Sequence, residues 1–91
     1  MMLTRRIQII NKLGLHARAA AKFVGVANRY DCDVAVGTSE ESMVNGKSIM
    51  QVMMLAAGKG SEIYIQCQGP QSEAAMNDLC ALIDDYFEEG E

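Results

Sequence analysis

The chain has no tryptophan, one proline and one histidine among its 91 residues, and its other aromatic side chains are two Phe and three Tyr. A hydrophobic core must therefore be built mainly from Ala, Val, Ile, Leu and the seven Met. Methionine suits irregular gaps because its side chain is unbranched and flexible. The length is sufficient for one domain, so we predict a single domain over residues 1–91.

Several classes of functional site lack the residues that they need. One histidine and three cysteines without C-x-x-C spacing form no recognisable zinc set, and the chain has no glycine-rich nucleotide signature. The net charge of −4 argues against a general nucleic-acid binder, which usually carries a basic excess. We expect no metal, no cofactor and no nucleic-acid partner.

The chain also lacks targeting and membrane signals. No apolar run approaches membrane-spanning length, and the N-terminal MMLTRRIQII has no long apolar region of the kind found in secretion signals. An odd number of cysteines without a disulfide framework favours reduced thiols in a reducing compartment. We expect a soluble cytoplasmic protein with no membrane insertion, in which Cys32, Cys67 and Cys80 are small core or partly buried residues.

Alternation of apolar and polar residues predicts four strands. In the first, LTRRIQI, Leu3, Ile7 and Ile9 share one face. The others are CDVAVG at 32–37, SMVN at 42–45 and SEIYIQCQG at 61–69. Because most of these strands are half polar, they favour one sheet with a single covered face.

Apolar residues at helical spacing predict three helices. The first follows Ala17, the second covers IMQVMMLAAG at 49–58 with Ser48 as its N-cap, and Pro70 suits the first turn of the third. The expected core stripe of the third helix comprises Ala75, Leu79, Leu82, Ile83 and Tyr86. The acidic end DDYFEEGE is expected to fray as a solubilising tail, since acidic residues are unfavourable at a helix C-terminus.

The resulting order, β-α-β-β-α-β-α, predicts helices packed on one sheet, an α+β arrangement. The order alone does not separate a ferredoxin-like arrangement from other two-layer sandwiches.

His16 stands where the loop NKLG gives way to the first helix. An imidazole can act as a nucleophile near neutral pH, and the unpaired N–H groups of a helix start bind anions. Arg18 adds a fork of donors that matches phosphate oxygens, and Gly14 lets the loop backbone approach closely. The residues alone leave two interpretations open: a phosphoryl-accepting site, or a helix cap or solvated side chain, which is the commoner role of such a histidine.

Two separated segments resemble HPr, the histidine-containing phosphocarrier family of the bacterial phosphoenolpyruvate:sugar phosphotransferase system. LGLHARAAAKFV at 13–24 is similar to the active-site pattern L-G-L-H-A-R-P-A, and GKSIMQVMMLAAGKGSEIYI at 46–65 is similar to the family's regulatory-serine segment. The resemblance implies an open-faced β-sandwich with four antiparallel strands in the order 1-4-2-3 and three helices on one face.

The resemblance also implies the chemistry. His16 would be phosphorylated on Nδ1 and Arg18 would steady the phosphate. Enzyme I would be the donor and an enzyme IIA domain the acceptor, so the protein would be a carrier and not a stand-alone enzyme. Ser48 would be a regulatory phosphorylation site where an HPr kinase/phosphorylase is present, a role compatible with capping a helix.

A partner-docking face follows from the same resemblance. We expect Lys12, Ala19, Lys22, Lys47, Met50 and Met54 to contribute to it. The expected buried stripe of the second helix is Ile49, Val52, Met53 and Ala56, which leaves the two methionines exposed. Lys12, Arg18, Lys22, Lys47 and Lys59 either ring this face or are scattered solvated charges. We expect a monomer, because a carrier presents one face to successive partners.

Three matters stay open. Ala19 replaces the family's proline, which leaves room for an altered transfer rate or partner choice. The carrier could serve a regulatory branch, nitrogen-related or catabolite-control, without sugar transport. In a different class, the chain could be a small α/β regulatory module that binds partners without covalent chemistry. The residues identify neither the acceptor nor the sugar.

Overall fold

A computed structural model describes residues 2–90 and contains the predicted order of elements. The strands and helices are β1 (Met2–Gln8), α1 (Ala17–Ala27), β2 (Asp33–Gly37), β3 (Met43–Asn45), α2 (Ile49–Met53), β4 (Glu62–Gln68) and α3 (Ser72–Asp84). A short turn of 3₁₀ type, η1 (Tyr86–Glu88), follows α3 and was not predicted.

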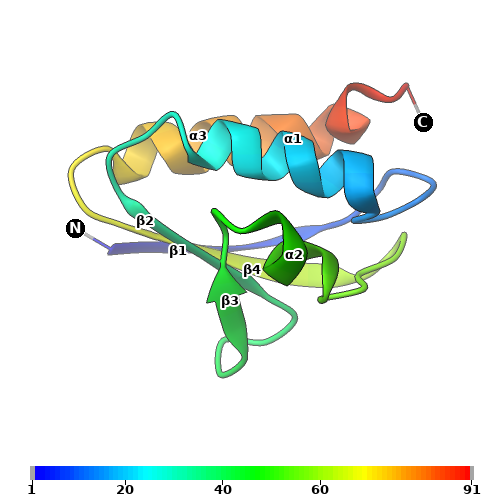
Figure 1. Ribbon diagram of the computed structural model, residues 1–91, viewed down its shortest axis with the longest axis horizontal. Coiled ribbons are helices and arrows are strands. Elements are labelled where there is room, and N and C mark those ends of the chain that lie inside the picture. Colours follow the sequence, from blue (N-terminus) through cyan, green and yellow to red (C-terminus); the bar gives the residue numbers. More distant parts are fainter. Residues whose placement is uncertain (1, 91) are drawn as a thin grey trace.

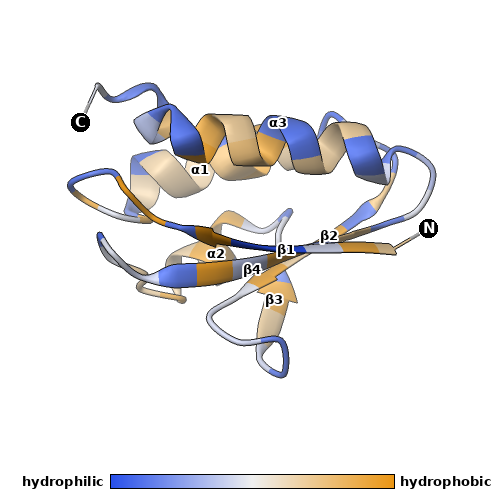
Figure 2. Ribbon diagram, turned by 180° about the vertical axis from the view of Figure 1, so that it is seen from behind, coloured by the Kyte–Doolittle hydropathy of each residue, from blue (hydrophilic) through white to orange (hydrophobic). Residues whose placement is uncertain are grey.

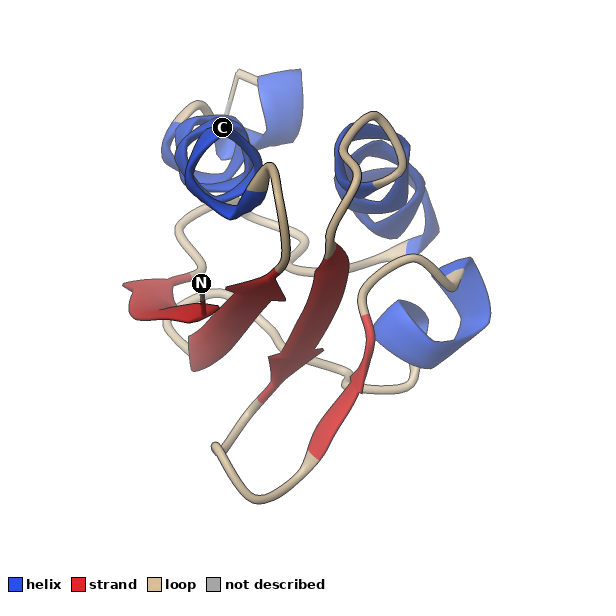
Figure 3. Ribbon diagram, turned by 90° about the vertical axis from the view of Figure 1, so that its left-hand side faces the viewer, coloured by secondary structure: helices blue, strands red, loops and turns tan. Residues whose placement is uncertain are grey.

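The four strands form one antiparallel sheet in the order β1-β4-β2-β3, which confirms the arrangement implied by the family resemblance. Helices α1 and α3 lie side by side over one face of the sheet, and α2 lies at the β3 margin next to α1 (Figures 1 and 3). Within residues 2–90, the other face of the sheet carries no helix. This placement decides among the two-layer sandwiches that the order of elements had left open.

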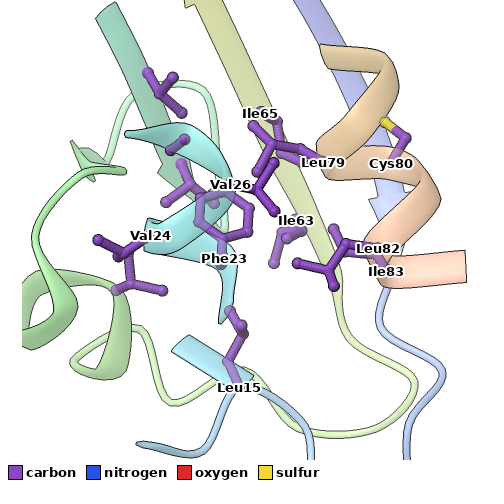
Figure 4. Close-up of a cluster of buried hydrophobic side chains, with 14 of the residues drawn as sticks. Leu15, Phe23, Val24, Val26, Ile63, Ile65, Leu79, Cys80, Leu82 and Ile83 are labelled. Atoms are coloured by element: carbon purple, nitrogen blue, oxygen red, sulfur yellow. The ribbon is translucent and has the colours of Figure 1, made fainter. Parts of the chain in front are cut away.

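The core lies between the sheet and the helices α1 and α3. Ile63 and Ile65 of β4 are fully buried, as is Phe23 of α1, because alternate residues of a central strand point to the covered face. Figure 4 shows these side chains meeting those of α3, with Leu15 of the loop before α1 beside them. Hydrophobic and hydrophilic residues alternate along β4 in Figure 2, as expected for a sheet with one covered face.

The second helix is shorter than predicted. It ends at Met53 instead of Gly58, and Val52 is its only buried residue. Ile49 and Met53, placed on a buried stripe by the sequence pattern, are 43% and 40% exposed, and Ala56 is also exposed. A short helix at the margin of the sheet has room to bury one side chain, so the predicted stripe is wrong for three of its four members.

The third helix begins later than the position of Pro70 suggested. Pro70 lies in the turn before α3, which starts at Ser72. The Ser72 hydroxyl donates to the carbonyl of Gly69 at 2.7 Å, and this bond closes the turn. The proline therefore belongs to the connection and not to the first turn of the helix.

The predicted fraying of the acidic end is wrong for the residues up to Gly90. Tyr86, Phe87 and Glu88 have φ values of 55°, 52° and 64°, a left-handed turn that costs about 1–2 kcal/mol per residue. This reversal exposes Tyr86, which the helical pattern had assigned to the core, and buries Phe87 completely. The Lys22 ammonium donates to the Phe87 carbonyl at 2.7 Å. Burial of a phenylalanine side chain contributes about 1.5–3 kcal/mol against the cost of the turn.

The cysteines are as predicted. Cys32, Cys67 and Cys80 are free and buried. Burial raises the pKa of the Cys67 thiol to about 11, and the neighbouring thiols Cys32 and Cys80 add to the shift. A thiol so rarely ionised is a poor nucleophile. Among the helices described, none is long and apolar enough to cross a membrane.

Two glycines allow a matched test of backbone constraint. Gly14 has a φ of +67°, and a Cβ there would lie 2.4 Å from the Ala57 carbonyl oxygen, whereas a Cβ on Gly25 in α1 would meet nothing within 4 Å. We expect Gly14→Ala to lower the free energy of unfolding by more than about 1 kcal/mol. Gly25→Ala should raise it by about 0.5–1 kcal/mol, measured by urea denaturation. Equal effects of the two substitutions would contradict this account of Gly14.

The anchor of the C-terminal turn can be tested in the same way. Phe87→Ala removes a fully buried ring and should lower the free energy of unfolding by about 3–5 kcal/mol. Tyr86→Ala, one residue away on the surface, should cost less than about 1 kcal/mol. If both variants unfold at the wild-type urea concentration, the turn does not pack on the core in solution.

Candidate functional site

His16 is the N-cap of α1. Its backbone is extended, with φ −74° and ψ 179°, and its Nδ1 accepts the backbone N–H of Arg18 at 3.2 Å. The first helical hydrogen bond runs from the Ala20 N–H to the His16 carbonyl at 2.8 Å. The imidazole is therefore a helix cap, as one interpretation held, and the same contact aims Nδ1 at the helix end that attracts anions.

The loop before the helix is fixed by a close backbone approach. The Leu15 N–H donates to the Ala57 carbonyl at 2.9 Å, and Gly14 lies too close to that carbonyl for a side chain to fit. The Leu15 side chain is buried beside the core. His16 therefore sits on a loop pinned between the core and the segment after α2.

A carboxylate from the far end of the chain completes the site. Glu89 Oε2 lies 2.7 Å from His16 Nε2 and 3.3 Å from Arg18 Nε. The partners assign the proton positions: Nδ1 faces an N–H and must carry a lone pair, whereas Nε2 faces a carboxylate and must carry the hydrogen. The nitrogen with the lone pair is thus the one at the helix start.

Glu89 is held in its charged form. Burial raises the pKa of its carboxyl, but hydrogen bonds from Asn11, His16 and Arg18 lower it by more, so the net pKa lies below the ordinary value. The side chain is 9% exposed, compared with 67% for Arg18. A carboxylate that is ionised at neutral pH thus lies beside the imidazole.

Sequence reasoning missed Glu89 and Asn11. Glu89 had been assigned to the solubilising tail, and it is separated from His16 by 73 positions. Neither residue belongs to a motif, and no local spacing brings them to the histidine. The signal that could have found Glu89 is the aromatic pair Tyr86 and Phe87 in a mostly acidic end, which indicates that this segment packs against the core.

The predicted docking residues are only partly available to a partner. Met50 and Met54 are 76% and 78% exposed, as predicted. Lys12 is exposed and, with Leu13, Arg18 and Glu89, lines a shallow hollow of about 180 Å³ beside the histidine.

Three of the predicted docking residues need correction or qualification. Ala19 is fully buried in the first turn of α1, so its side chain cannot contact a partner, and its assignment to the docking face is wrong. Lys22 donates to the Phe87 carbonyl, and Lys47 donates to the Tyr30 carbonyl at 3.0 Å. Both ammonium groups are therefore used in hydrogen bonds within the chain, so the predicted ring of basic side chains around the docking face is incomplete.

Ser48 is the N-cap of α2, as predicted. Its Oγ accepts the backbone N–H of Gln51 at 3.3 Å, and its side chain is half-buried. Over residues 2–90, no group of three His, Cys, Asp or Glu side chains lies close enough to hold a metal ion.

The chain is similar to known proteins over nearly its whole length. Residues 3–85 match the family model described as "PTS HPr component phosphorylation site". The chain is 64% identical over 85 residues to phosphocarrier protein HPr of Pseudomonas aeruginosa, covering 93% of this chain and 94% of the relative. It is 52% identical over 90 residues to HPr of Neisseria meningitidis, covering 99% of this chain and all of the relative.

Solved structures of HPr proteins have the same fold. The crystal structure of HPr from Bacillus anthracis aligns with a TM-score of 0.83 at 43% identity, over 90% of this chain and 96% of that one. HPr-C-His from Thermoanaerobacter tengcongensis aligns with a TM-score of 0.89 at 37% identity, over 96% and 97%. The capped histidine, the topology and the relatives lead to one conclusion: the chain belongs to the HPr family of phosphocarrier proteins of the phosphotransferase system.

Proposed function

We propose that His16 accepts a phosphoryl group on Nδ1 from phosphorylated enzyme I and passes it to an enzyme IIA domain. One observation carries this proposal. Nδ1 holds its lone pair at the start of α1, where Arg18 supplies a backbone N–H at 3.2 Å, while Nε2 is occupied by Glu89. The nucleophile, His16 Nδ1, therefore lies next to the N–H groups at the start of α1 that would bind a phosphate.

The transfer follows from these positions. The Nδ1 lone pair forms a bond to phosphorus, while the bond between phosphorus and the donor atom breaks and that atom keeps its electron pair. The phosphoryl oxygens then accept the Arg18 N–H that Nδ1 had held, together with guanidinium N–H groups. Arg18 can adapt because its side chain is 67% exposed. Such a step depends on position and charge more than on acid–base chemistry.

The protein acts as a recyclable carrier in this scheme. The reverse displacement returns the electron pair to Nδ1 when the acceptor takes the phosphoryl group. The resulting product is the starting protein, so the chain has no turnover without its two partners. The cytoplasm is the expected compartment, and the three buried free thiols Cys32, Cys67 and Cys80 fit its reducing conditions.

The partners are expected to dock over α2 and the start of α1. The exposed apolar side chains there are Leu13, Ile49, Met50, Met53 and Met54. Flexible methionines can repack against more than one partner surface. Lys12 and Arg18 flank the histidine and would steer acidic partners by long-range attraction. The monomer leaves this face free for each partner in turn.

Ala19 is expected to be compatible with transfer. It is the third residue of α1, and the helical ladder begins one residue later, at Ala20. The N–H at position 19 is therefore not needed by the helix, which is why either alanine or the family's proline can stand there.

Intact-mass spectrometry tests the carrier role. Incubation with phosphoenolpyruvate and enzyme I should add one phosphoryl group that is lost in acid, and His16→Ala should abolish the adduct. Arg18→Ala should slow its formation by about tenfold or more, because it removes a charge-assisted phosphate contact. No adduct under conditions that charge a known HPr, or an adduct that persists in His16→Ala, would disprove the proposal.

Regulatory phosphorylation of Ser48 is a second part of the proposal, and charge substitution tests it. Ser48→Asp retains a good N-cap and adds a negative charge beside Met50, so it should slow phosphoryl transfer while changing stability by less than about 0.5 kcal/mol. Ser48→Ala loses the cap at a cost of about 1 kcal/mol and should leave the transfer rate unchanged. If both variants slow transfer equally, loss of the serine hydroxyl and not the added charge is responsible, and regulation through the charge at this position is disproved.

A further inference from the structure

We propose that Asn11 and Glu89 are positioning residues that clamp Nε2 of His16 and so keep Nδ1 as the reactive nitrogen. This inference rests on the proposed function, since it names further residues for the same transfer. It assigns a role to the C-terminal turn and to a buried amide, neither of which belongs to the segments that resemble the family motifs.

Both oxygens of the Glu89 carboxylate are used. Oε1 accepts from Asn11 Nδ2 at 3.2 Å, and Oε2 lies 2.7 Å from His16 Nε2 and 3.3 Å from Arg18 Nε. A carboxylate bound at both oxygens cannot rotate without losing a partner. The imidazole ring is therefore held by Glu89 on one nitrogen and by the helix start on the other.

Asn11 links this carboxylate to the histidine loop. It is fully buried, and its Nδ2 also donates to the Gly14 carbonyl at 2.9 Å. Because both neighbours are acceptors, only the amide nitrogen fits between them, and both of its hydrogens are used. One side chain thus ties the backbone two residues before His16 to the group that holds the ring.

The C-terminal turn delivers the carboxylate. Phe87 is fully buried and Lys22 donates to its carbonyl, so the turn is anchored two residues before Glu89. The left-handed backbone of 86–88 directs the chain back over the start of α1. The Glu89 side chain is 9% exposed, which places it in a site partly shielded from water, where a charge acts more strongly.

The clamp has a chemical consequence in the transfer step. When the Nδ1 lone pair bonds to phosphorus, the proton stays on Nε2 and the ring gains positive charge. The carboxylate at 2.7 Å stabilises that charge as it develops, without itself contacting the phosphoryl group. When the acceptor takes the phosphoryl group, the electron pair returns to Nδ1 and the ring becomes neutral again.

Nuclear magnetic resonance on the unphosphorylated protein tests the clamp directly. With ¹⁵N-labelled histidine, wild type should show a downfield, slowly exchanging Nε2–H signal from the short bond to Glu89. Glu89→Ala should lose this signal. Glu88→Ala is the matched control: it lies in the same turn, its carboxylate is 4.0 Å from Lys22, and it should retain the signal.

The kinetics of phosphoryl transfer test the proposed positioning role of Glu89. Glu89→Ala should lower the maximal rate of His16 phosphorylation by about tenfold or more, the loss expected for one charge-assisted hydrogen bond, with KM for enzyme I unchanged because Glu89 is nearly buried. Glu89→Gln, which keeps an acceptor without charge, should recover the Nε2–H signal and only part of the rate. Glu88→Ala should match wild type.

Asn11 is tested against Glu89 by a double-mutant cycle. Asn11→Asp keeps the size of the side chain and places an acceptor against the carboxylate, so it should lower the rate as Glu89→Ala does. In the Glu89→Ala background it should cause a smaller loss of rate than in wild type, because only its contact with the Gly14 carbonyl then remains to be disrupted. Additive losses would overturn that role.

The outcomes separate this inference from the proposed function. If Glu89→Ala and Glu88→Ala give the same rate and the same Nε2–H signal, the clamp is disproved while the carrier role stands. If wild type forms no adduct on His16, the carrier role fails. The Nε2–H signal would then still report whether Glu89 holds the ring.

Discussion

Burial of one face of a four-stranded sheet under α1 and α3 is the constraint on which the other features of this protein depend. Ile63 and Ile65 on the central strand β4 pack against Phe23 of α1 and the apolar stripe of α3. Because strands alternate their side chains, this packing fixes which face is covered. It also places the first turn of α1 at the edge of the core, where a loop residue can cap the helix.

The site joins one local feature to one distant feature. Capping places Nδ1 of His16 against the N–H of Arg18, and this requires only the residues around the helix start. The contact on Nε2 requires Glu89, which reaches the ring because Phe87 is buried and the chain reverses in a left-handed turn. The unfavourable left-handed backbone at residues 86–88 is thus what allows Glu89 to contact the histidine. Backbone strain of this kind often occurs near functional sites.

Pattern reasoning succeeded where a local period was strong and failed near the ends of elements. The exposure of Met50 and Met54 followed from helical spacing, and the cap at Ser48 followed from the turn and the serine at the start of the helix. Ile49 and Met53 were misplaced because the pattern cannot tell how far a short helix at the sheet margin is covered. Tyr86 was misplaced because the helical period was extended past Asp84, where α3 ends.

The sequence by itself determined the order of the elements, the apolar faces, the family and the candidate histidine, because these depend on local periodicity and on short motifs. The sheet order was implied by the family resemblance and not by any local pattern, and the structure confirmed it. Only the tertiary structure decided the burial of Ala19, the contact of Asn11 with Glu89 and that of Glu89 with His16. Contacts between positions 73 apart leave no local pattern. They form when burial of Phe87 brings the C-terminal turn over α1. The free energy of that closure depends on residues far apart in the sequence, so no single segment predicts it.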